Sequence, residues 1–293
     1  MSWRTVIVSS HAKLDLQVGF MQIRGDDGVR RIILDEIDVL MVESTAVSLT
    51  AALLAELVER KVRVIFCDRK RLPVAELTPC HGCHDSSRRL KIQLAWTREA
   101  RARVWQLIVK EKICNQAALL QRIGKGQEYD LLLRYAQEVG PGDRTNREGV
   151  AAKTYFSGLF GSDFTREKRC DINSALDYGY QVMLSVFARE VAVEGYVTEL
   201  GIFHDNVYNS YNLASDLIEP FRPLVDAVVR DWFSNLDQEF DKDLKRKLVG
   251  LLHEEVRIDG TSQTVINAII SYTRSVTDAL MTGDVSGLRF IER

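Results

Sequence analysis

The chain has no apolar run long enough to cross a membrane, because polar or charged side chains interrupt every hydrophobic stretch within about 18 residues. Its first residues, MSWRTVIVSSHAKLD, contain no apolar core followed by small residues, so we expect no signal peptide. Five cysteines, an odd number, do not indicate a disulfide framework in such a chain. These absences favour a cytoplasmic protein with reduced thiols and no membrane association.

A strong excess of either charge is also missing. The chain has 39 Lys and Arg residues against 41 Asp and Glu residues, so its net charge is −2. The protein as a whole is not a polycation, and a surface that binds nucleic acid would have to be local. With 46% apolar residues among 293, the chain can bury the core of one large domain or two ordinary ones.

Strands are predicted in the first seventy residues, because segments rich in Val, Ile and Phe are separated by turn residues. The segments are TVIVSS, LQVGFMQIR, RRIILDEIDVLMVE and VRVIFCD. The sequence GDDG at 25–28 is typical of a hairpin turn. Between the last two segments, STAVSLTAALLAELVERK at 44–61 has apolar residues at helical spacing and predicts a helix.

The remaining two-thirds of the chain has a helical pattern. A polar segment at 68–87 is expected to be a loop or linker. After it we predict one long helix at 93–123 and further helices at 128–138, 148–160, 174–194, 216–234, 241–255 and 261–282. The predicted fold class is therefore α+β. A β-rich domain at 1–75 and a linker at 76–90 precede an all-α domain at 91–293.

Positive charge is concentrated at the start of the helical part. Between Arg88 and Lys125 there are ten Lys or Arg residues against two Glu residues, and the same stretch contains Trp96 and Trp105. One interpretation is a solvated helix face with tryptophans in the core. The other is a ridge that contacts phosphates.

The motif CHGCH at 80–84 has the spacing of a haem-attachment site. Haem attachment follows export, and no export signal is seen. A zinc site needs four ligands, and the chain has no second pair of cysteines to complete one. An incidental pair of reduced cysteines, Cys80 and Cys83, is the alternative. His84, beside the basic helix, could contact a ligand.

Glu148 lies in the sequence GPGDRTNREGV and has two interpretations. Thr145 and Glu148 have the spacing of a capping box, in which the glutamate only stabilises a helix start. Alternatively, Arg144 and Arg147 flank a carboxylate at a helix N-terminus. Such a site can hold a phosphate and a metal together.

His204 and Glu219 lie at the two ends of a polar segment. A lone histidine is more often structural than a ligand, and Asp216 and Glu219 have the spacing of an N-cap pattern. However, Pro220 and Pro223 lack a backbone N–H, so the helix start is irregular and carboxylates there can face a cavity. Two carboxylates and an imidazole would suit Mg²⁺ or Mn²⁺. Local spacing does not show that Glu148 reaches the other two residues.

A series of motifs runs through the whole chain, namely WRTV, EID, VIFCD followed by KRLP, HDSS, NREG, LFG, LDYGY, FAREV and EPFRP. With these motifs the sequence resembles the CRISPR-associated spacer-acquisition integrases, the Cas-one family. It is most similar to the form found beside the single-protein, RNA-guided effector nuclease of type II systems. The resemblance covers essentially all of the chain, although Cys80 and Cys83 depart from the family pattern.

The resemblance implies roles for specific residues. The metal ligands and catalytic residues would be Glu148 in NREG, His204 in GIFH and Glu219 in EPFRP. Residues expected to wall the site are Asn173, Tyr178, Tyr180 and Asp216. Residues expected to bind DNA phosphates are Arg144, Arg147, Arg222, Arg88, Arg89 and Lys91.

The resemblance also implies domain roles, partners and a reaction. The domain at 1–75 would serve dimerisation and partner contacts, and the domain at 91–293 would be catalytic. The family acts as a homodimer, and two dimers flank a dimer of the small Cas-two protein to form a heterohexamer. Double-stranded DNA would be bound both as spacer precursor and as CRISPR repeat. The type II effector nuclease and an accessory adaptation protein take part in acquisition. The 3′-hydroxyl of the captured DNA would attack a phosphodiester at the edge of the repeat, with Mg²⁺ or Mn²⁺ as cofactor.

Two other classes of function stay open at this point. A non-catalytic DNA-binding scaffold of a CRISPR complex would use the acidic and histidine residues only to cap helices. A metal hydrolase acting on a small substrate would not need the positive charge at 88–125. Dependence of activity on metal separates the scaffold from the enzyme.

Overall fold

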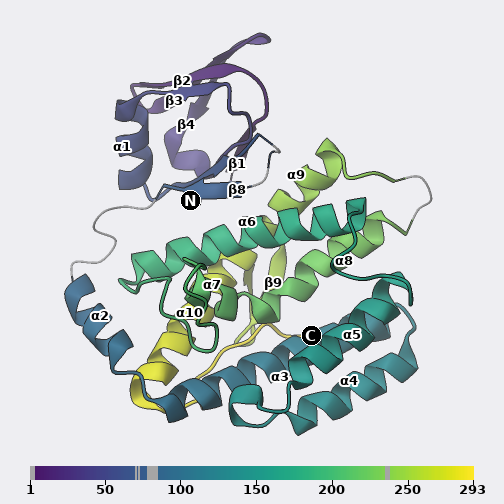
Figure 1. Ribbon diagram of the computed structural model, residues 1–293. Helices are drawn as coiled ribbons and strands as arrows, with labels where there is room; N and C mark the ends of the chain where they lie inside the picture. Colours follow the sequence, from purple (N-terminus) through teal and green to yellow (C-terminus); the bar gives the residue numbers. More distant parts are fainter. Residues whose placement is uncertain (1–3, 70, 72, 78–84, 235–237) are drawn as a thin grey trace. The chain divides into compact units, whose positions relative to one another are not determined.

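The computed structural model in Figure 1 describes residues 4–69, 71, 73–77, 85–234 and 238–293. The chain divides into two compact units, Met1–Gly82 and Cys83–Arg293. The division falls inside the 76–90 segment that the sequence suggests as a linker. The first unit is rich in strands and the second is mainly helical, so the predicted α+β class is confirmed.

The first unit contains two four-stranded sheets. One has the order β1-β5-β7-β8, with parallel pairing of the first three strands and antiparallel pairing of the last. Its strands are β1 (Arg4–Val8), β5 (Ile37–Val42), β7 (Arg63–Cys67) and β8 (Pro73–Glu76). The other has the order β4-β3-β2-β6 and consists of β2 (Ala12–Gln17), β3 (Phe20–Gly25), β4 (Gly28–Ile33) and β6 (Val47–Leu49).

The predicted strands of this unit are present, with four changes of boundary. The segment RRIILDEIDVLMVE at 30–43 contains the end of β4 and all of β5, with a 3₁₀ turn at Leu34–Glu36 between them. The segment LQVGFMQIR contains the end of β2 and most of β3, because Gly19 makes a turn with φ of 75° between them. The predicted helix at 44–61 is shorter. It is α1 (Ala51–Glu59), which begins after Thr50 accepts the Leu53 N–H at 3.3 Å, while Val47–Leu49 is strand β6. Strand β8 lies in the segment 68–87, which the sequence suggested was loop.

The core of the first unit explains why the sequences of its strands are rich in apolar residues. Leu14, Leu53, Leu57 and Val64 are at most 1% exposed and pack in one cluster with residues of both sheets. The helix α1 contributes the two leucines, which are four residues apart and therefore on one face. This unit contains apolar packing and surface ion pairs, and the candidate site residues all lie in the other unit.

The second unit is built from helices joined by short turns. They are α2 (Ser86–Leu94), α3 (Arg98–Arg122), α4 (Gly126–Glu138), α5 (Arg147–Phe160), α6 (Asp171–Val193), α7 (Asn212–Leu217), α8 (Arg222–Trp232), α9 (Lys242–Gly250) and α10 (Val265–Thr282). Short 3₁₀ turns are η2 (Pro141–Asp143), η3 (Glu219–Phe221) and η4 (Leu251–His253). Figure 1 shows α3, α4 and α5 packed together, and α6 lies against α8, α9 and α10.

The long helix predicted at 93–123 is present over 98–122, but the prediction is wrong at its start. Helix α2 ends at Leu94, and α3 begins at Arg98 after the Thr97 hydroxyl accepts the Ala100 N–H at 3.1 Å. The break places the Trp96 ring in the interior, where it is 5% exposed. The threonine N-cap inside the apolar pattern was the local signal for this break.

Two other helix predictions are also wrong at their ends. The segment 216–234 is not one helix, because η3 separates α7 from α8 at Pro220. In the C-terminal part, β9 (Glu255–Ile258) pairs antiparallel with β10 (Thr261–Thr264), where helix was predicted to reach 255 and to begin at 261. Asp259 and Gly260 have φ of 54° and 71°, the geometry of a two-residue hairpin turn. The second unit is therefore helical with one small sheet rather than all-α.

Among the described residues, no helix combines the length and apolar character that a membrane span requires.

Candidate functional site

The first turn of α5 positions Glu148 through a cap that the sequence did not indicate. The Asp143 carboxylate accepts the N–H groups of Arg147 and Glu148, both at 2.9 Å. The N-cap residue is Asn146, whose side chain accepts the Gly149 N–H at 3.2 Å. The capping box predicted from Thr145 and Glu148 is therefore wrong. Because Asp143 and Asn146 satisfy the helix start, the Glu148 side chain is available for other contacts.

The Glu148 carboxylate shares one cation with Glu219. The Lys112 ammonium on α3 lies 2.6 Å from Glu148 Oε1 and 2.5 Å from Glu219 Oε2. The side chains of Lys112 and Glu219 are 9% and 5% exposed, so this bridge is buried. Helix α3 is anchored beside η3 because Asn115 donates a hydrogen bond to the Pro220 carbonyl at 2.9 Å. The two carboxylates, from α5 and η3, thus face the same point.

Glu219 is held from its other side by Arg222. The Arg222 Nε donates to Glu219 Oε1 at 2.9 Å, one turn along the chain. Burial raises the pKa of Glu219, but the positive charges of Arg222 and Lys112 outweigh it and lower that pKa to about 2. Burial likewise lowers the pKa of Lys112, and Glu219 and Glu148 outweigh it in the raising direction. Glu219 and Lys112 are therefore both charged at neutral pH.

His204 lies in the loop before α7, where Asp216 orients it. The buried Asp216 carboxylate accepts the N–H groups of Phe203 and His204 at 3.0 and 3.1 Å and contacts His204 Nδ1 at 2.6 Å. Asp216 lies inside α7 and caps the preceding loop, so its predicted role as N-cap of a following helix is wrong. Gly201 is required here, because a Cβ would come within 2.3 Å of the His204 carbonyl oxygen.

The imidazole of His204 is electrostatically connected to both glutamates. The hydrogen bond that His204 donates to Asp216 is the main cause that raises the pKa of His204. Burial opposes it, and the charges of Asp216, Glu219 and Glu148 add to the increase. Since Asp216 binds Nδ1, Nε2 is the ring nitrogen that a ligand can contact. The carboxylate–histidine pair has the form of a metal ligand with its outer-sphere partner.

The three predicted metal ligands converge on one region, but they do not form a ready coordination sphere. Within the part of the chain that the structure describes, no group of three His, Cys, Asp or Glu side chains is arranged to hold a metal ion. The Lys112 ammonium lies between the two carboxylates, at the position that a metal ion bound by both would need. The donors suit Mg²⁺ or Mn²⁺ in charge and in atom type. The metal site therefore stays a prediction that the donor set fits.

A second buried group lies behind Arg222. The Arg222 guanidinium is 4.5 Å from the centre of the Tyr180 ring, which places a cation over an aromatic face. The Tyr180 hydroxyl donates to Asp226 Oδ1, and the Tyr155 hydroxyl donates to Asp226 Oδ2 at 2.8 Å. Tyr180, which the resemblance places in the wall of the site, thus supports the arginine that holds Glu219.

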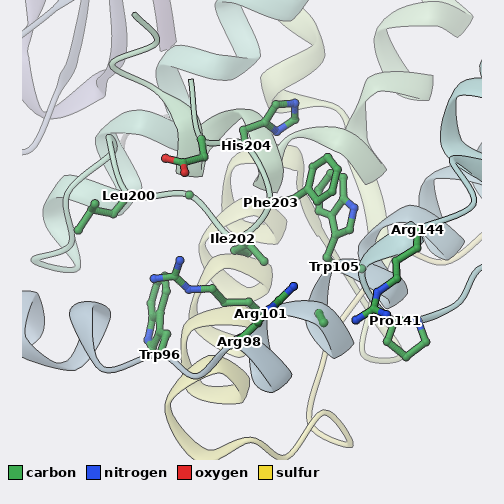
Figure 2. Close-up of a pocket in the computed structure, with 14 residues that line it drawn as sticks. Trp96, Arg98, Arg101, Trp105, Pro141, Arg144, Leu200, Ile202, Phe203 and His204 are labelled. Carbon is green, nitrogen blue, oxygen red and sulfur yellow. The ribbon is translucent and has the colours of Figure 1, made fainter. Parts of the chain in front are cut away.

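A pocket of about 520 Å³ opens beside His204. Figure 2 shows Arg98, Arg101 and Arg144 in the lower half of the view and His204 in the upper half. None of these three arginines forms an ion pair with a carboxylate among the residues that the structure describes. The ring of Phe203 stacks on Trp105 with centroids 4.5 Å apart and is half exposed. Three arginines without acidic partners, next to an open aromatic face, are suited to nucleotide phosphates and bases.

The residues predicted to bind DNA differ in whether they are free to contact it. Arg144 lines this pocket, and Arg88 and Lys91 are exposed on α2. Arg89 on the same helix instead donates to the Tyr196 hydroxyl at 3.2 Å, and Arg147 pairs with Glu138 at 3.0 Å. Arg89 and Arg147 are therefore already engaged within the protein.

Two residues predicted to wall the site make structural contacts. The Asn173 side chain donates to the carbonyls of Thr165 and Lys168 at 2.8 and 2.7 Å, which fixes the loop before α6. Tyr178 is fully buried and packs against the Phe240 ring, with centroids 5.7 Å apart. The CHGCH motif with Cys80 and Cys83 lies outside the described residues.

Four residues of the site were not singled out from the sequence. Lys112 was counted only as one of ten basic residues, although its place among buried positions of α3 could have set it apart. Asp226 gave no local signal. Arg101 and Arg98 belong to the basic stretch, but only the turn at η2 shows that they face Arg144.

The sequence was compared with known protein families. A sequence model of the family described as "CRISPR associated protein Cas1" matches residues 5–259. The chain is 34% identical over 284 residues to the CRISPR-associated endonuclease Cas1 of Neisseria meningitidis serogroup C (strain 8013). That match covers 95% of this chain and 93% of the relative.

Solved structures show the same fold. A casposase bound to integration product matches with a TM-score of 0.79 and 19% identity, covering 97% of this chain and 92% of that one. A chain of a Cas6-RT-Cas1–Cas2 complex matches with a TM-score of 0.74 and 19% identity, covering 97% of this chain and 36% of that longer one. At these identities the likeness concerns the fold.

Proposed function

The chain belongs to the CRISPR-associated Cas1 family, and from this premise we propose that it is a metal-dependent DNA endonuclease and integrase of CRISPR adaptation. It joins the 3′-hydroxyl ends of captured spacer DNA to the CRISPR repeat by transesterification. Support comes from the name of the relative from Neisseria meningitidis, an endonuclease, and from the similar casposase, which was solved with an integration product.

One observation supports the chemistry of this proposal. Carboxylate oxygens of Glu148 on α5 and Glu219 in η3 both point at one buried cation, the Lys112 ammonium. Sequence-remote carboxylates seldom share such a point unless a cation is to be held there, because each buried charge costs free energy. Glu148, Glu219 and His204 Nε2 would hold Mg²⁺ or Mn²⁺. The metal would polarise a phosphoryl oxygen and stabilise the leaving oxygen.

The protein's own residues prepare the site for this reaction. Asp216 keeps the proton of His204 on Nδ1, so that Nε2 can act as a ligand. Arg222 keeps Glu219 ionised and fixes its orientation. Phosphoryl transfer needs little covalent work from a protein, so positioning of the DNA ends dominates.

The pocket beside His204 supplies that positioning. Arg98, Arg101 and Arg144 would bind phosphates next to the reacting 3′ end, and the half-exposed Phe203 ring would stack on a base. The exposed Arg88 and Lys91 would extend the phosphate contacts along α2. Such contacts are independent of sequence and weaken as salt rises.

The partners belong to the same proposal. The protein would act as a homodimer and assemble with a small Cas2 protein into a heterohexamer, in the cytoplasm, on double-stranded DNA. The similar chain from a Cas6-RT-Cas1–Cas2 complex supports the Cas2 partner. The type II effector nuclease and an accessory adaptation protein would join during acquisition.

Strand transfer tests the proposal. Purified protein with its Cas2 partner is mixed with a 3′-hydroxyl duplex and a plasmid carrying the cognate repeat, in Mn²⁺, Mg²⁺ or chelator. We expect metal-dependent joining that is lost in Glu148→Gln, His204→Asn and Glu219→Gln. The matched control is Glu99→Gln, an exposed glutamate on α3 that pairs with Arg103, and it should join normally.

The rival function is a non-catalytic DNA-binding scaffold. It predicts equal DNA binding with metal and with chelator, and no joining in any condition. Joining that survives in one of the three variants would remove that residue from the metal site and leave the function in place.

A further inference from the structure

Lys112 is in an unusual place for a lysine. It lies on α3 among positions that face the interior, including Ile108, Val109 and Ile113, which are fully buried. Its side chain is 9% exposed. Lysines are rarely buried to this extent unless the ammonium is paired, because the charged group loses its hydration. Here the ammonium contacts two carboxylates from two other elements.

The ammonium takes the position that a divalent cation would need. It lies 2.6 Å from the Glu148 oxygen and 2.5 Å from the Glu219 oxygen. Oxygen ligands bind Mg²⁺ at about 2.0–2.1 Å, so a metal between the two carboxylates would draw them slightly closer together than the ammonium does. Both cations cannot be held between the same two oxygens, because their charges repel strongly at such short separation in a buried site.

The charges around the two carboxylates are consistent with replacement of the Lys112 ammonium by a divalent cation. Glu148 and Glu219 supply two negative charges, and Lys112 and Arg222 supply two positive charges. Arg222 is fixed over the Tyr180 ring and bonds the other oxygen of Glu219, so it does not need to move. The ammonium of Lys112 is on a long, flexible side chain that can withdraw.

We propose that Lys112 is an internal cation that closes the Glu148–Glu219 pair in the metal-free protein, and that a divalent cation binds only when its ammonium leaves. This inference rests on the proposed metal site. It assigns Lys112 a regulatory and stabilising role: the residue holds the two carboxylates together without metal and competes with the metal for them.

Metal affinity and thermal stability test the proposal. The variants are Lys112→Met, which removes the charge at similar length, and Lys112→Gln, which keeps a hydrogen-bond donor in case the methionine variant fails to fold. The control is Lys110→Met, an exposed lysine on the same helix. Mn²⁺ binding is measured by titration calorimetry on chelator-treated protein, and the melting temperature is measured in chelator and in Mn²⁺.

The Lys112 variants should bind Mn²⁺ more tightly than wild type, on the order of tenfold, because no ammonium has to be displaced. In chelator their melting temperature should fall by roughly 5–10 °C, because two buried carboxylates lose a counter-ion. Mn²⁺ should restore most of this loss and stabilise the variants more than it stabilises wild type. Lys110→Met should match wild type in both measurements.

The outcomes separate this inference from the proposed function. Glu148→Gln shows whether the Mn²⁺ measured in wild type is at this site. If it is, and the Lys112 variants bind Mn²⁺ with the same or weaker affinity, the competition is disproved while the metal site stands. If neither wild type nor the Lys112 variants bind Mn²⁺ at this site, the metal site and the inference both fail. Binding in the Lys112 variants but not in wild type supports the inference in its strongest form.

Discussion

Glu219 and Asp226 are seven residues apart in the η3–α8 segment, and both are buried, at 4% and 1% exposure. Burial raises the pKa of each carboxyl group. However, Arg222 and Lys112 lower the pKa of Glu219 to about 2, whereas the pKa of Asp226 is raised to about 6. Asp226 accepts hydrogen bonds from the Tyr180 and Tyr155 hydroxyls. These bonds and the more distant charges of Arg222 and Arg166 do not offset its loss of hydration.

The difference shows that the type of partner, rather than burial, decides what a carboxylate can do. A glutamate held by two cations stays charged at neutral pH. An aspartate held by two phenols is near the point of protonation and acts as a fixed anchor for aromatic rings. Arg222 connects the two groups, because it bonds Glu219 and lies over Tyr180.

Removal of Arg222 should have the largest effect on the difference between Glu219 and Asp226. In Arg222→Ala, Glu219 loses the cation that lowers its pKa most, so that pKa should rise towards that of Asp226. The free energy of unfolding should fall by about 2 kcal/mol, because a buried carboxylate is left with Lys112 alone. Urea unfolding at pH 7.5 in chelator measures this loss. Arg230→Ala removes a partly exposed arginine of α8 that pairs with the exposed Asp231, and it should change stability by less than about 0.5 kcal/mol. An equal loss in both variants would contradict the assignment.

The pH dependence of stability should distinguish Glu219 from Asp226, because their contributions to stability change in opposite directions as the pH rises. Glu219 has a folded pKa below its unfolded value, so its contribution is present above about pH 5 and is lost as the pH falls towards 2. Asp226 has a folded pKa above its unfolded value, so its contribution is present below about pH 4 and is lost as the pH rises through 6.

Urea unfolding in chelator between pH 3 and 7.5 isolates each group by difference from a variant. The stability of wild type relative to Glu219→Gln should increase with pH up to about 5. Relative to Asp226→Asn it should decrease between about pH 4 and 6.5, by roughly 2 kcal/mol. Parallel curves for wild type and Asp226→Asn would show that Asp226 stays ionised throughout.

The smallest expected effect concerns the three arginines of the pocket, which form no ion pair with a carboxylate among the described residues. Arg98→Ala, Arg101→Ala and Arg144→Ala should each weaken DNA binding several-fold at physiological salt. Each should reduce the slope of log affinity against log salt by about one, because one phosphate contact is lost. Arg103→Ala on the same helix pairs with Glu99 and serves as the control. A salt slope that is unchanged in all three variants would exclude the pocket from the DNA path.

Local pattern predicted much of the architecture. The turn at 25–28, the strands around it, and the helices α4, α5 and α6 were found within a few residues of their ends. The errors have physical causes. Thr97 and Pro220 break apolar patterns that otherwise continue, and the turn at Asp259 and Gly260 separates short strands whose residues also occur in helices.

The sequence alone determined the α+β class, the family and the membership of Glu148, His204 and Glu219 in one motif set, because these depend on side-chain order along the chain. Only the tertiary structure decided which charges meet. Lys112 and Glu148 are 36 residues apart, and the packing of α3 against α5 and η3 brings one ammonium between two carboxylates. The pKa of a buried group depends on neighbours within a few ångströms in space, and neither periodicity nor capping rules specify those neighbours.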